Sequence, residues 1–243
     1  MSRTIMITGA SRGIGLEMTR QAAARGDKVI ACCRDAMQAT DLIAAAKQND
    51  DITVLGLDVC AENDMNNIAA GMTRPIDILV CNAASNPYYG PMEGISDDQF
   101  EKILSNNVIS NHWLVQQVAP GMRNRKDGAI IIVSSIGGMK GSTTIGAYNI
   151  SKAADFQLAR NLAAEFGADN VRINCIAPGL IKTDFARALW EDPQMLELVT
   201  ATAPLKRIGL PEEVAGAAVF LAAPAGNFIT GQSIVVDGGV TSV

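Results

Sequence analysis

Tyr148 and Lys152, in the stretch YNISK at residues 148–152, are a phenol and an amine four positions apart. Side chains at this spacing on a helix lie on one face, one turn apart, so the two groups could act together as an acid–base pair. The same spacing is also typical of an amphipathic helix end that places both groups in water. The pair alone does not decide between these interpretations, so the elements that would position it must be considered.

A glycine-rich stretch, TGASRGIG at residues 8–15, lies between the first apolar run of the chain and the first stretch of helical periodicity. Gly9, Gly13 and Gly15 would permit a tight turn and would let backbone N–H groups and the helix N-terminus approach a pyrophosphate. The alternative is a helix entry that needs small residues only for packing. The position directly after a first strand favours a phosphate-binding loop.

Short apolar runs alternate with stretches of helical periodicity along the whole chain. This alternation is typical of parallel strands joined by right-handed crossover helices, with both faces of the sheet covered. No repeat or linker divides the chain, so we predict a single α/β domain over residues 1–243, doubly wound (Rossmann-type), with a seven-stranded parallel sheet and helices on both faces. The expected strands are 3–8, 28–33, 51–59, 76–83, 128–135, 171–178 and 232–239, and the first two expected helices are 13–26 and 37–48.

The bulk composition is that of an ordinary globular enzyme, with 243 residues, 48% hydrophobic residues, 19% charged residues and a formal net charge of −5. An acidic chain without runs of like charge predicts no nucleic-acid partner and no anionic membrane partner. Its most apolar long stretch, residues 214–226, is too short to span a bilayer.

The five cysteines, which include the adjacent Cys32 and Cys33, show neither metal-binding nor redox spacing. We therefore expect reduced, buried thiols and no metal site. The N-terminus lacks a signal-peptide layout, so the expected location is the cytoplasm. The single histidine, His112, is interpreted as a packed or surface residue of a helix and not as a catalytic group.

The spacing T-G-x-x-x-G-x-G at residues 8–15 resembles the phosphate loop of the short-chain dehydrogenase/reductase family. Further motifs of that family follow in order and at matching distances over nearly the whole chain. One motif departs from the family pattern, because Ala84 stands where glycine is usual, and we expect this change to leave coenzyme binding intact. The resemblance implies a nicotinamide-dependent oxidoreductase and a homotetramer. The matching segments are NAAS (82–85), NNV (106–108), SS (134–135), YNISK (148–152), PGLIKT (178–183) and VDGG (236–239).

The resemblance gives Tyr148 and Lys152 catalytic roles. Tyr148 would be the general acid that protonates a carbonyl oxygen as hydride arrives, or the base in the reverse reaction. An ammonium group about 4 Å from the phenol, at an effective dielectric constant of about 20, contributes about 4 kcal/mol. This interaction would lower the pKa of the phenol from about 10 toward neutrality. Lys152 is the expected cation, and by resemblance it would also bind the nicotinamide ribose.

Two further polar residues complete the implied catalytic set. Ser135 lies thirteen positions before the tyrosine, as the family serine does, and would hydrogen-bond the substrate oxygen. Its neighbour Ser134 must face the opposite way on a strand. Asn107 resembles the family asparagine that holds a water leading to the lysine, with Asn106 as the alternative.

Arg34 follows the second expected strand, where the adenosine ribose of a dinucleotide is usually bound. An acidic side chain there would bond a free 2′-hydroxyl group, but this chain has Cys33 and Arg34. Together with Arg12, two guanidinium groups could bind a 2′-phosphate, each bond contributing about 1.5–3 kcal/mol. We therefore predict NADP(H) over NAD(H). The alternatives are that Arg34 is only solvated, that Arg12 pairs with an acid, and that Asp35 competes for Arg34 or contacts the ribose itself.

Other coenzyme contacts are implied by the matched motifs. Asp58 resembles the acid that contacts the adenine, and Thr183 would bond the nicotinamide carboxamide, as would the backbone of Ile181. The remaining expected coenzyme-binding residues are Gly9, Ser11, Gly13, Ile14, Gly15, Val59, Asn82, Ala83, Pro178 and Gly179.

Two segments are expected to shape the substrate pocket: residues 85–91, after the fourth strand, and residues 184–199, predicted to form a lid helix within a lid at 184–205. Because they bring apolar and aromatic side chains and few basic ones, we predict a small to medium hydrophobic ketone, aldehyde or secondary alcohol. The alternative is that the lid aromatics only pack the lid on the domain. The expected pocket residues are Tyr88, Tyr89, Ile136, Phe185, Leu189 and Trp190, with Met195 as a further candidate.

The main hypothesis is an NADPH-dependent carbonyl reductase or, in reverse, an alcohol dehydrogenase. NPYYGP (86–91) and APGLIKTDFARALW (177–190) resemble family members that reduce retinal, aromatic ketones and vicinal dicarbonyls. Some of those members carry a peroxisomal address, which the C-terminal TSV does not match. The rivals are a 3-oxoacyl thioester reductase of the same family and a nucleotide-binding scaffold without catalysis.

Overall fold

The computed structural model describes residues 2–64, 68 and 74–243. Over these residues, seven parallel strands form one sheet in the order β3-β2-β1-β4-β5-β6-β7. The order runs outward in opposite directions from β1 and β4, so the chain winds both ways from the centre and leaves a crevice at the carboxyl ends of these two strands. The predicted doubly wound fold is confirmed. The strands are β1 (Thr4–Thr8), β2 (Lys28–Cys33), β3 (Ile52–Gly56), β4 (Ile78–Cys81), β5 (Gly128–Val133), β6 (Val171–Pro178) and β7 (Ser233–Val236).

Successive residues of the inner strands alternate between two apolar cores, one on each face of the sheet. In β1, Ile5 and Ile7 belong to one core, whereas Met6 belongs to the other. In β5, Ile131 and Ile130 divide in the same way. Side chains of a strand alternate between its faces, so a continuous apolar run is required where both faces are covered. This is why β4 and β5 are continuous apolar runs, whereas the Arg172 and Asn174 side chains of β6 are buried only with backbone carbonyl partners.

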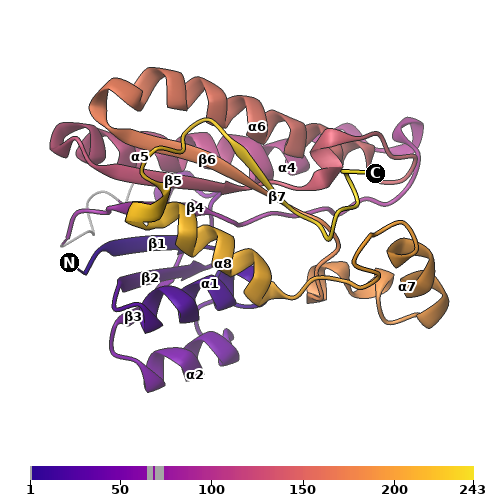
Figure 1. The fold of residues 1–243 in the computed structure, drawn as a ribbon, viewed down its shortest axis with the longest axis horizontal. Coiled ribbons are helices and arrows are strands. Elements are labelled where there is room, and N and C mark those ends of the chain that lie inside the picture. The colour runs from indigo at the N-terminus through magenta and orange to yellow at the C-terminus, as the bar shows by residue number, and fades with distance from the viewer. Residues whose placement is uncertain (1, 65–67, 69–73) are drawn as a thin grey trace.

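Helices cover both faces of the sheet (Figure 1). One layer packs against the core that contains Ile5, and α1 and α8 pack against each other within it. The other layer lies on the opposite face, with α6 packed against β6 and α4 beside α6. The first layer comprises α1 (Gly13–Ala24), α2 (Thr40–Gln48) and α8 (Pro211–Ala222), and the second comprises α4 (Asp97–Leu104), α5 (Ser110–Arg125) and α6 (Gly146–Phe166).

A π-helical turn, Ser105–Ile109, joins α4 to α5. Such turns disrupt the regular hydrogen-bond ladder of a helix, and here side chains bind two of its carbonyl groups. The Ser110 hydroxyl donates to the Asn106 carbonyl at 2.7 Å, and the Asn111 amide donates to the Asn107 carbonyl at 2.7 Å. The side chain of Asn107 is fully buried in this turn.

The predicted lid helix at 184–199 is wrong in its detail. The segment forms a 3₁₀ helix, Asp184–Leu189, followed by a separate short helix α7, Pro193–Thr200. Asp192 ends the continuity, because its side chain accepts from the backbone N–H of Gln194 at 2.9 Å and caps α7, while Pro193 suits the first helical turn. In Figure 1, α7 stands apart from the two helical layers.

The other differences from the expected elements are at their ends. The helix predicted at 37–48 begins at Thr40, because Asp35 accepts from the backbone N–H of Gln38 at 3.2 Å and holds a turn there. The strand predicted at 51–59 ends at Gly56. Four short 3₁₀ turns complete the described elements: Met92–Gly94, Ile136–Met139, Gly167–Asp169 and Pro224–Gly226.

Candidate active site

A cleft of about 580 Å³ opens at the carboxyl ends of the strands, in the crevice between the two halves of the sheet. Most residues predicted from the sequence meet there, although they come from widely separated segments. The predicted residues that line it are Gly9, Ser11, Arg12, Gly13, Ile14, Gly15, Arg34, Val59, Asn82, Ala83, Tyr89, Ser135, Ile136, Tyr148, Lys152, Pro178, Gly179, Ile181, Thr183, Phe185 and Leu189.

The glycine loop has the backbone geometry of an anion cradle. Gly9 and Gly13 have φ angles of +65° and +56°, in the left-handed region that favours glycine. A Cβ atom on Gly15 would lie 2.3 Å from the carbonyl oxygen of Gly9. No side chain caps the N-terminus of α1, so its first backbone N–H groups remain available at the cleft. These features fit the pyrophosphate of a dinucleotide.

Gly15→Ala is expected to lower the free energy of unfolding by about 1–3 kcal/mol, because the added methyl group must displace the backbone of Gly9. Urea unfolding followed by circular dichroism measures the change. The matched control is Gly216→Ala in α8, where a Cβ atom meets nothing within 4 Å. That variant is expected to gain about 0.5–1 kcal/mol, since alanine is the better helix former. A wild-type stability for Gly15→Ala would contradict the steric argument.

Asn82 ties the end of β4 to the glycine loop. Its side-chain amide donates to the carbonyl groups of Thr8 and Gly9 at 3.0 and 3.1 Å. The Thr8 hydroxyl in turn accepts from the backbone N–H groups of Asn82 and Ala83. Thus the residues directly after β4 hold the glycine loop in place through the Asn82 side chain and two backbone N–H groups. Ala84, the departure from the family pattern, lines the cleft and takes no part in these hydrogen bonds.

The two predicted phosphate-binding arginines lie at the cleft, and one is partly engaged. The Arg12 guanidinium lies 3.9 Å from the Asp184 carboxylate, at the start of the lid. Arg34 is exposed, and none of the ion pairs formed among residues 2–64, 68 and 74–243 involves it. Asp35 accepts from the Gln38 backbone instead of pairing with Arg34. The arginine therefore has donors available beside Cys33, and the chemistry of this end of the cleft fits a 2′-phosphate.

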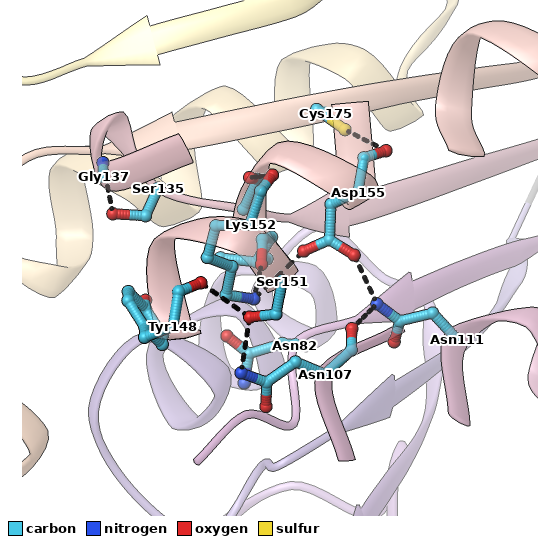
Figure 2. A network of polar contacts seen from close by, with 12 residues as sticks. Asn82, Asn107, Asn111, Ser135, Gly137, Tyr148, Ser151, Lys152, Asp155 and Cys175 are labelled. Atoms are coloured by element: carbon cyan, nitrogen blue, oxygen red, sulfur yellow. Dashed lines mark hydrogen bonds and ion pairs between the residues drawn. The ribbon is translucent and has the colours of Figure 1, made fainter. Parts of the chain in front are cut away.

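Ser135, Tyr148 and Lys152 meet at the other end of the cleft (Figure 2). Tyr148 and Lys152 lie one turn apart on α6, and the Lys152 ammonium lies 5.8 Å from the centroid of the Tyr148 ring. Ser135 follows β5, and its hydroxyl accepts from the Gly137 backbone N–H at 3.0 Å. Ser134 is buried and donates to the Lys152 carbonyl at 2.7 Å, so of the two serines Ser135 has the freer hydroxyl.

The pKa of the Tyr148 phenol is raised, which contradicts the expectation of a lowered value. Burial raises this pKa more than the charge of Lys152 and the hydroxyl of Ser135 lower it, and the Asp155 carboxylate adds to the rise. The spacing predicted the cation correctly. It did not predict the desolvation of the phenol, nor the Asp155 carboxylate, whose charge opposes that of the ammonium group.

Asn107 lies behind the wall of the cleft, whereas Asn106 lines it. The Asn107 amide donates to the Ser85 carbonyl and the Ser151 hydroxyl, both at 3.0 Å, and its oxygen accepts from the Ser85 backbone N–H at 2.8 Å. Ser151 donates to the carbonyl of Tyr148 at 2.7 Å. Asn107 therefore connects the loop after β4 to α6 (Figure 2).

Three more predicted residues lie outside the wall of the cleft. The Asp58 carboxylate accepts from the Cys60 backbone N–H at 3.0 Å, so it holds a turn after β3. The Tyr88 hydroxyl donates to the Pro91 carbonyl at 2.8 Å within its own loop. The Trp190 indole donates to the Thr183 carbonyl at 2.9 Å and so holds the lid segment, of which it is part, to the residue just before it. For Trp190, the alternative interpretation of lid packing is the one that the structure favours.

The substrate end of the cleft is more polar than the sequence predicted. The ring centroid of Phe185 lies 5.9 Å from that of Tyr148, and the exposed side chains of Tyr89 and Leu189 line the same cleft. A set of polar residues that were not predicted individually shares this wall, and two of them, Ser85 and Asn86, lie in the segment 85–91 that was expected to shape the pocket. They follow the carboxyl ends of β4 and β5, a position from which they could have been predicted. These residues are Ser85, Asn86, Lys140, Ser142, Thr144 and Asn149.

Within the residues that the structure describes, no group of three or more His, Cys, Asp or Glu side chains is arranged for a metal ion. All five cysteines are free thiols, and Cys60 is the exposed one. No helix within residues 2–64, 68 and 74–243 combines the length and the apolar character that a membrane crossing requires.

The winding of the sheet, the glycine loop after β1 and the serine, tyrosine and lysine at the far end of one cleft define the class of protein: a dinucleotide-binding oxidoreductase. A family model described as enoyl-(acyl carrier protein) reductase matches residues 9–241. Dehydrogenase/reductase SDR family member 4 of Bos taurus is 38% identical over 247 residues, covering 99% of this chain and 88% of the relative. The chain belongs to the short-chain dehydrogenase/reductase family and is an oxidoreductase of that family.

Solved structures of the family superpose over nearly the whole chain. A candidate NAD(P)-dependent gluconate 5-dehydrogenase from Beutenbergia cavernae, with NADP bound, is 30% identical with a TM-score of 0.94, covering 99% of this chain and 97% of that one. A candidate β-ketoacyl-ACP reductase is 34% identical with a TM-score of 0.89, covering 99% and 98%.

Proposed function

We propose that this enzyme is an NADPH-dependent carbonyl reductase, or an alcohol dehydrogenase in the reverse direction, with Ser135, Tyr148 and Lys152 as catalytic residues. The observation that carries the proposal is the arrangement of one cleft, with Arg34 at one end and these three residues at the other. A cleft that has phosphate-binding groups at one end and proton-transfer groups at the other suits an extended dinucleotide.

The chemistry of the chain itself follows from this placement. The bound nicotinamide would supply the hydride that reaches the carbonyl carbon. Ser135 donates a hydrogen bond to the carbonyl oxygen, and Tyr148 transfers its phenolic proton to that oxygen as negative charge develops. Lys152 stabilises the phenolate that remains, and Asn107 holds α6 against the loop after β4. In the reverse direction, the phenolate removes the proton of the alcohol.

The preference for NADP(H) is supported by Arg34 and Arg12 and by the NADP in the similar structure from Beutenbergia cavernae. The guanidinium of Arg34 would pair with the 2′-phosphate, and Arg12 would join it when the lid releases Asp184. Thr183 and the Ile181 backbone would line the half of the cleft that takes the pyrophosphate and the nicotinamide. Thr183 lies close to the glycine loop, since a Cβ atom added to Gly13 would be 3.2 Å from its side chain.

The proposed substrate is a small to medium ketone or aldehyde with an apolar body. Phe185, Leu189, Ile136 and Tyr89 supply the apolar contacts. The polar groups of the same wall would bind a second oxygen of the substrate, as in a dicarbonyl compound. The enzyme would work in the cytoplasm as a homotetramer, and sedimentation of the purified protein tests the assembly.

A second candidate function is reduction of a 3-oxoacyl thioester, favoured by the similarity to a candidate β-ketoacyl-ACP reductase. One screen separates the two: turnover of an aryl ketone, a vicinal dicarbonyl and a 3-oxoacyl thioester, each with NADPH and with NADH. The carbonyl reductase proposal expects kcat/KM for the ketone or dicarbonyl to exceed that for the thioester. The opposite order would support the second candidate, and no turnover with any compound would support a binding protein without catalysis.

A further inference from the structure

The ammonium group of Lys152 is held by a carboxylate that the proposed mechanism does not use. The Lys152 side chain is 2% exposed and that of Asp155 is 0% exposed, and their charged atoms lie 3.1 Å apart within α6. Lys152 also donates to the backbone carbonyl of Val133, at the end of β5, at 2.9 Å. Asp155 is therefore the counter-ion of the lysine in a place from which water is excluded.

Asp155 is itself fixed from a second helix. The Asn111 side-chain amide donates to the Asp155 carboxylate at 3.0 Å and to the Asn107 carbonyl at 2.7 Å. Asn111 lies just after the π-helical turn. Its side-chain amide therefore both donates to the Asn107 carbonyl, which that turn leaves open, and orients the Asp155 carboxylate. Figure 2 shows the resulting chain of contacts from Asn107 through Asn111 and Asp155 to Lys152.

A buried ammonium group requires such a partner. Burial favours the neutral amine, and a carboxylate at hydrogen-bond distance restores the charged form. An ammonium group has three protons, of which two bind Val133 and Asp155. Since Lys152 also lines the cleft, its third proton is the one that can face a ligand there.

Other titratable groups around Lys152 do not replace this carboxylate. Tyr148 faces it from the same helix, Cys81 from β4 and Cys175 from β6. Burial raises the pKa of all three groups, so they remain neutral near pH 7. Burial also raises the pKa of the Asp155 carboxyl group, but the charge of Lys152 and the hydrogen bonds from Lys152 and Asn111 oppose this rise. Among the described residues in contact with the ammonium group, Asp155 is thus the one that can carry the compensating negative charge.

We propose that Asp155 is the positioning residue of Lys152: it keeps the buried ammonium group charged and holds it against Val133, with one proton directed at the coenzyme cleft. The inference rests on the proposed roles of Lys152 and Tyr148. Without the carboxylate, Lys152 loses its proton at lower pH, and both coenzyme binding and carbonyl reduction then weaken as the pH rises. In the wild-type enzyme, the charge persists because burial is offset by Asp155.

The test compares Asp155→Asn with the wild type. The dissociation constant of NADPH, from its fluorescence, and kcat/KM for reduction are measured from about pH 7 to about pH 9. The expected result is that NADPH binding by the variant weakens by about tenfold over this range, while the wild-type value stays nearly constant. The pH above which reduction falls is expected to drop by at least about one pH unit.

Asp27→Asn is the matched control, because Asp27 is also buried and paired with an arginine but lies at the start of β2, far along the chain from the site. It is expected to lose stability without a change in either pH profile. Asp155→Leu is the second variant if Asp155→Asn does not fold, since leucine has a similar volume and adds no polar group to satisfy.

Unchanged pH profiles in a folded Asp155 variant, or the same change in Asp27→Asn, would overturn the inference. Loss of activity at all pH values alike, with NADPH binding independent of pH, would also overturn it, since that result describes a purely structural role. These outcomes are distinct from failure of the proposed function, in which the wild-type enzyme itself neither binds NADPH nor reduces a carbonyl compound.

Discussion

Tyr148→Phe is expected to reduce kcat/KM for carbonyl reduction by about 10²–10⁴-fold and to leave NADPH binding within about twofold of the wild type. The substitution removes one hydroxyl group and keeps the ring, so the contact with Phe185 and the fold of α6 persist. What is lost is the proton that neutralises the developing alkoxide. Steady-state kinetics and NADPH fluorescence measure the two quantities separately.

The matched control is Tyr88→Phe, which removes a phenolic hydroxyl group that donates to the Pro91 carbonyl outside the wall of the cleft. It is expected to retain nearly full activity. If Tyr148→Phe kept more than about one hundredth of the wild-type rate, general acid catalysis by this group would be the wrong assignment.

Arg34→Ala is expected to weaken NADPH binding by about 10–100-fold and NADH binding by less than about threefold. The reason is that the guanidinium of Arg34 has no carboxylate partner among the described residues that the coenzyme would have to displace, so its bonds to a 2′-phosphate are lost in full. Titration with both coenzymes gives the ratio directly.

Arg20→Ala, which removes an exposed guanidinium of α1 that pairs with Glu17, is the control for a general effect of charge. It is expected to weaken both coenzymes equally and only slightly. Equal losses of NADPH and NADH affinity in Arg34→Ala would rule out a phosphate-binding role for Arg34. They would mean that the adenosine end of the cleft does not distinguish a 2′-phosphate from a 2′-hydroxyl group.

The fold was predictable because its determinants are local and periodic. All seven strands were expected from apolar runs, since the inner strands are buried on both faces. In β6 the run is interrupted by Arg172 and Asn174, whose buried side chains donate to backbone carbonyl groups. The predicted lid helix failed at Asp192 and Pro193, which are typical of the start of a helix and not of its interior. The sequence therefore carries the signal that divides the lid segment, in the capping side chain of Asp192 and the proline after it.

The part of the site that consists of residues in motifs with fixed spacings was predictable from the sequence. The glycine loop and the pair Tyr148 and Lys152 have fixed spacings, and the structure brings them into one cleft. Asp155 lies three residues after Lys152, a spacing that brings side chains together on a helix, but its role depends on burial that spacing cannot report. The direction of the Tyr148 pKa escaped prediction for the same reason, because it depends on desolvation from several elements at once.

The bonds of Lys152 to Val133 and Asp155 have a consequence for the way a ligand is received. Immobilising a free lysine side chain costs about 1.5–2 kcal/mol in rotamer freedom. Here the side chain is already immobile in the folded protein. Its rotamer entropy is therefore lost during folding and does not reduce the binding free energy of the coenzyme. A coenzyme arriving at this cleft meets a donor whose direction was set when α5, α6 and β5 packed together.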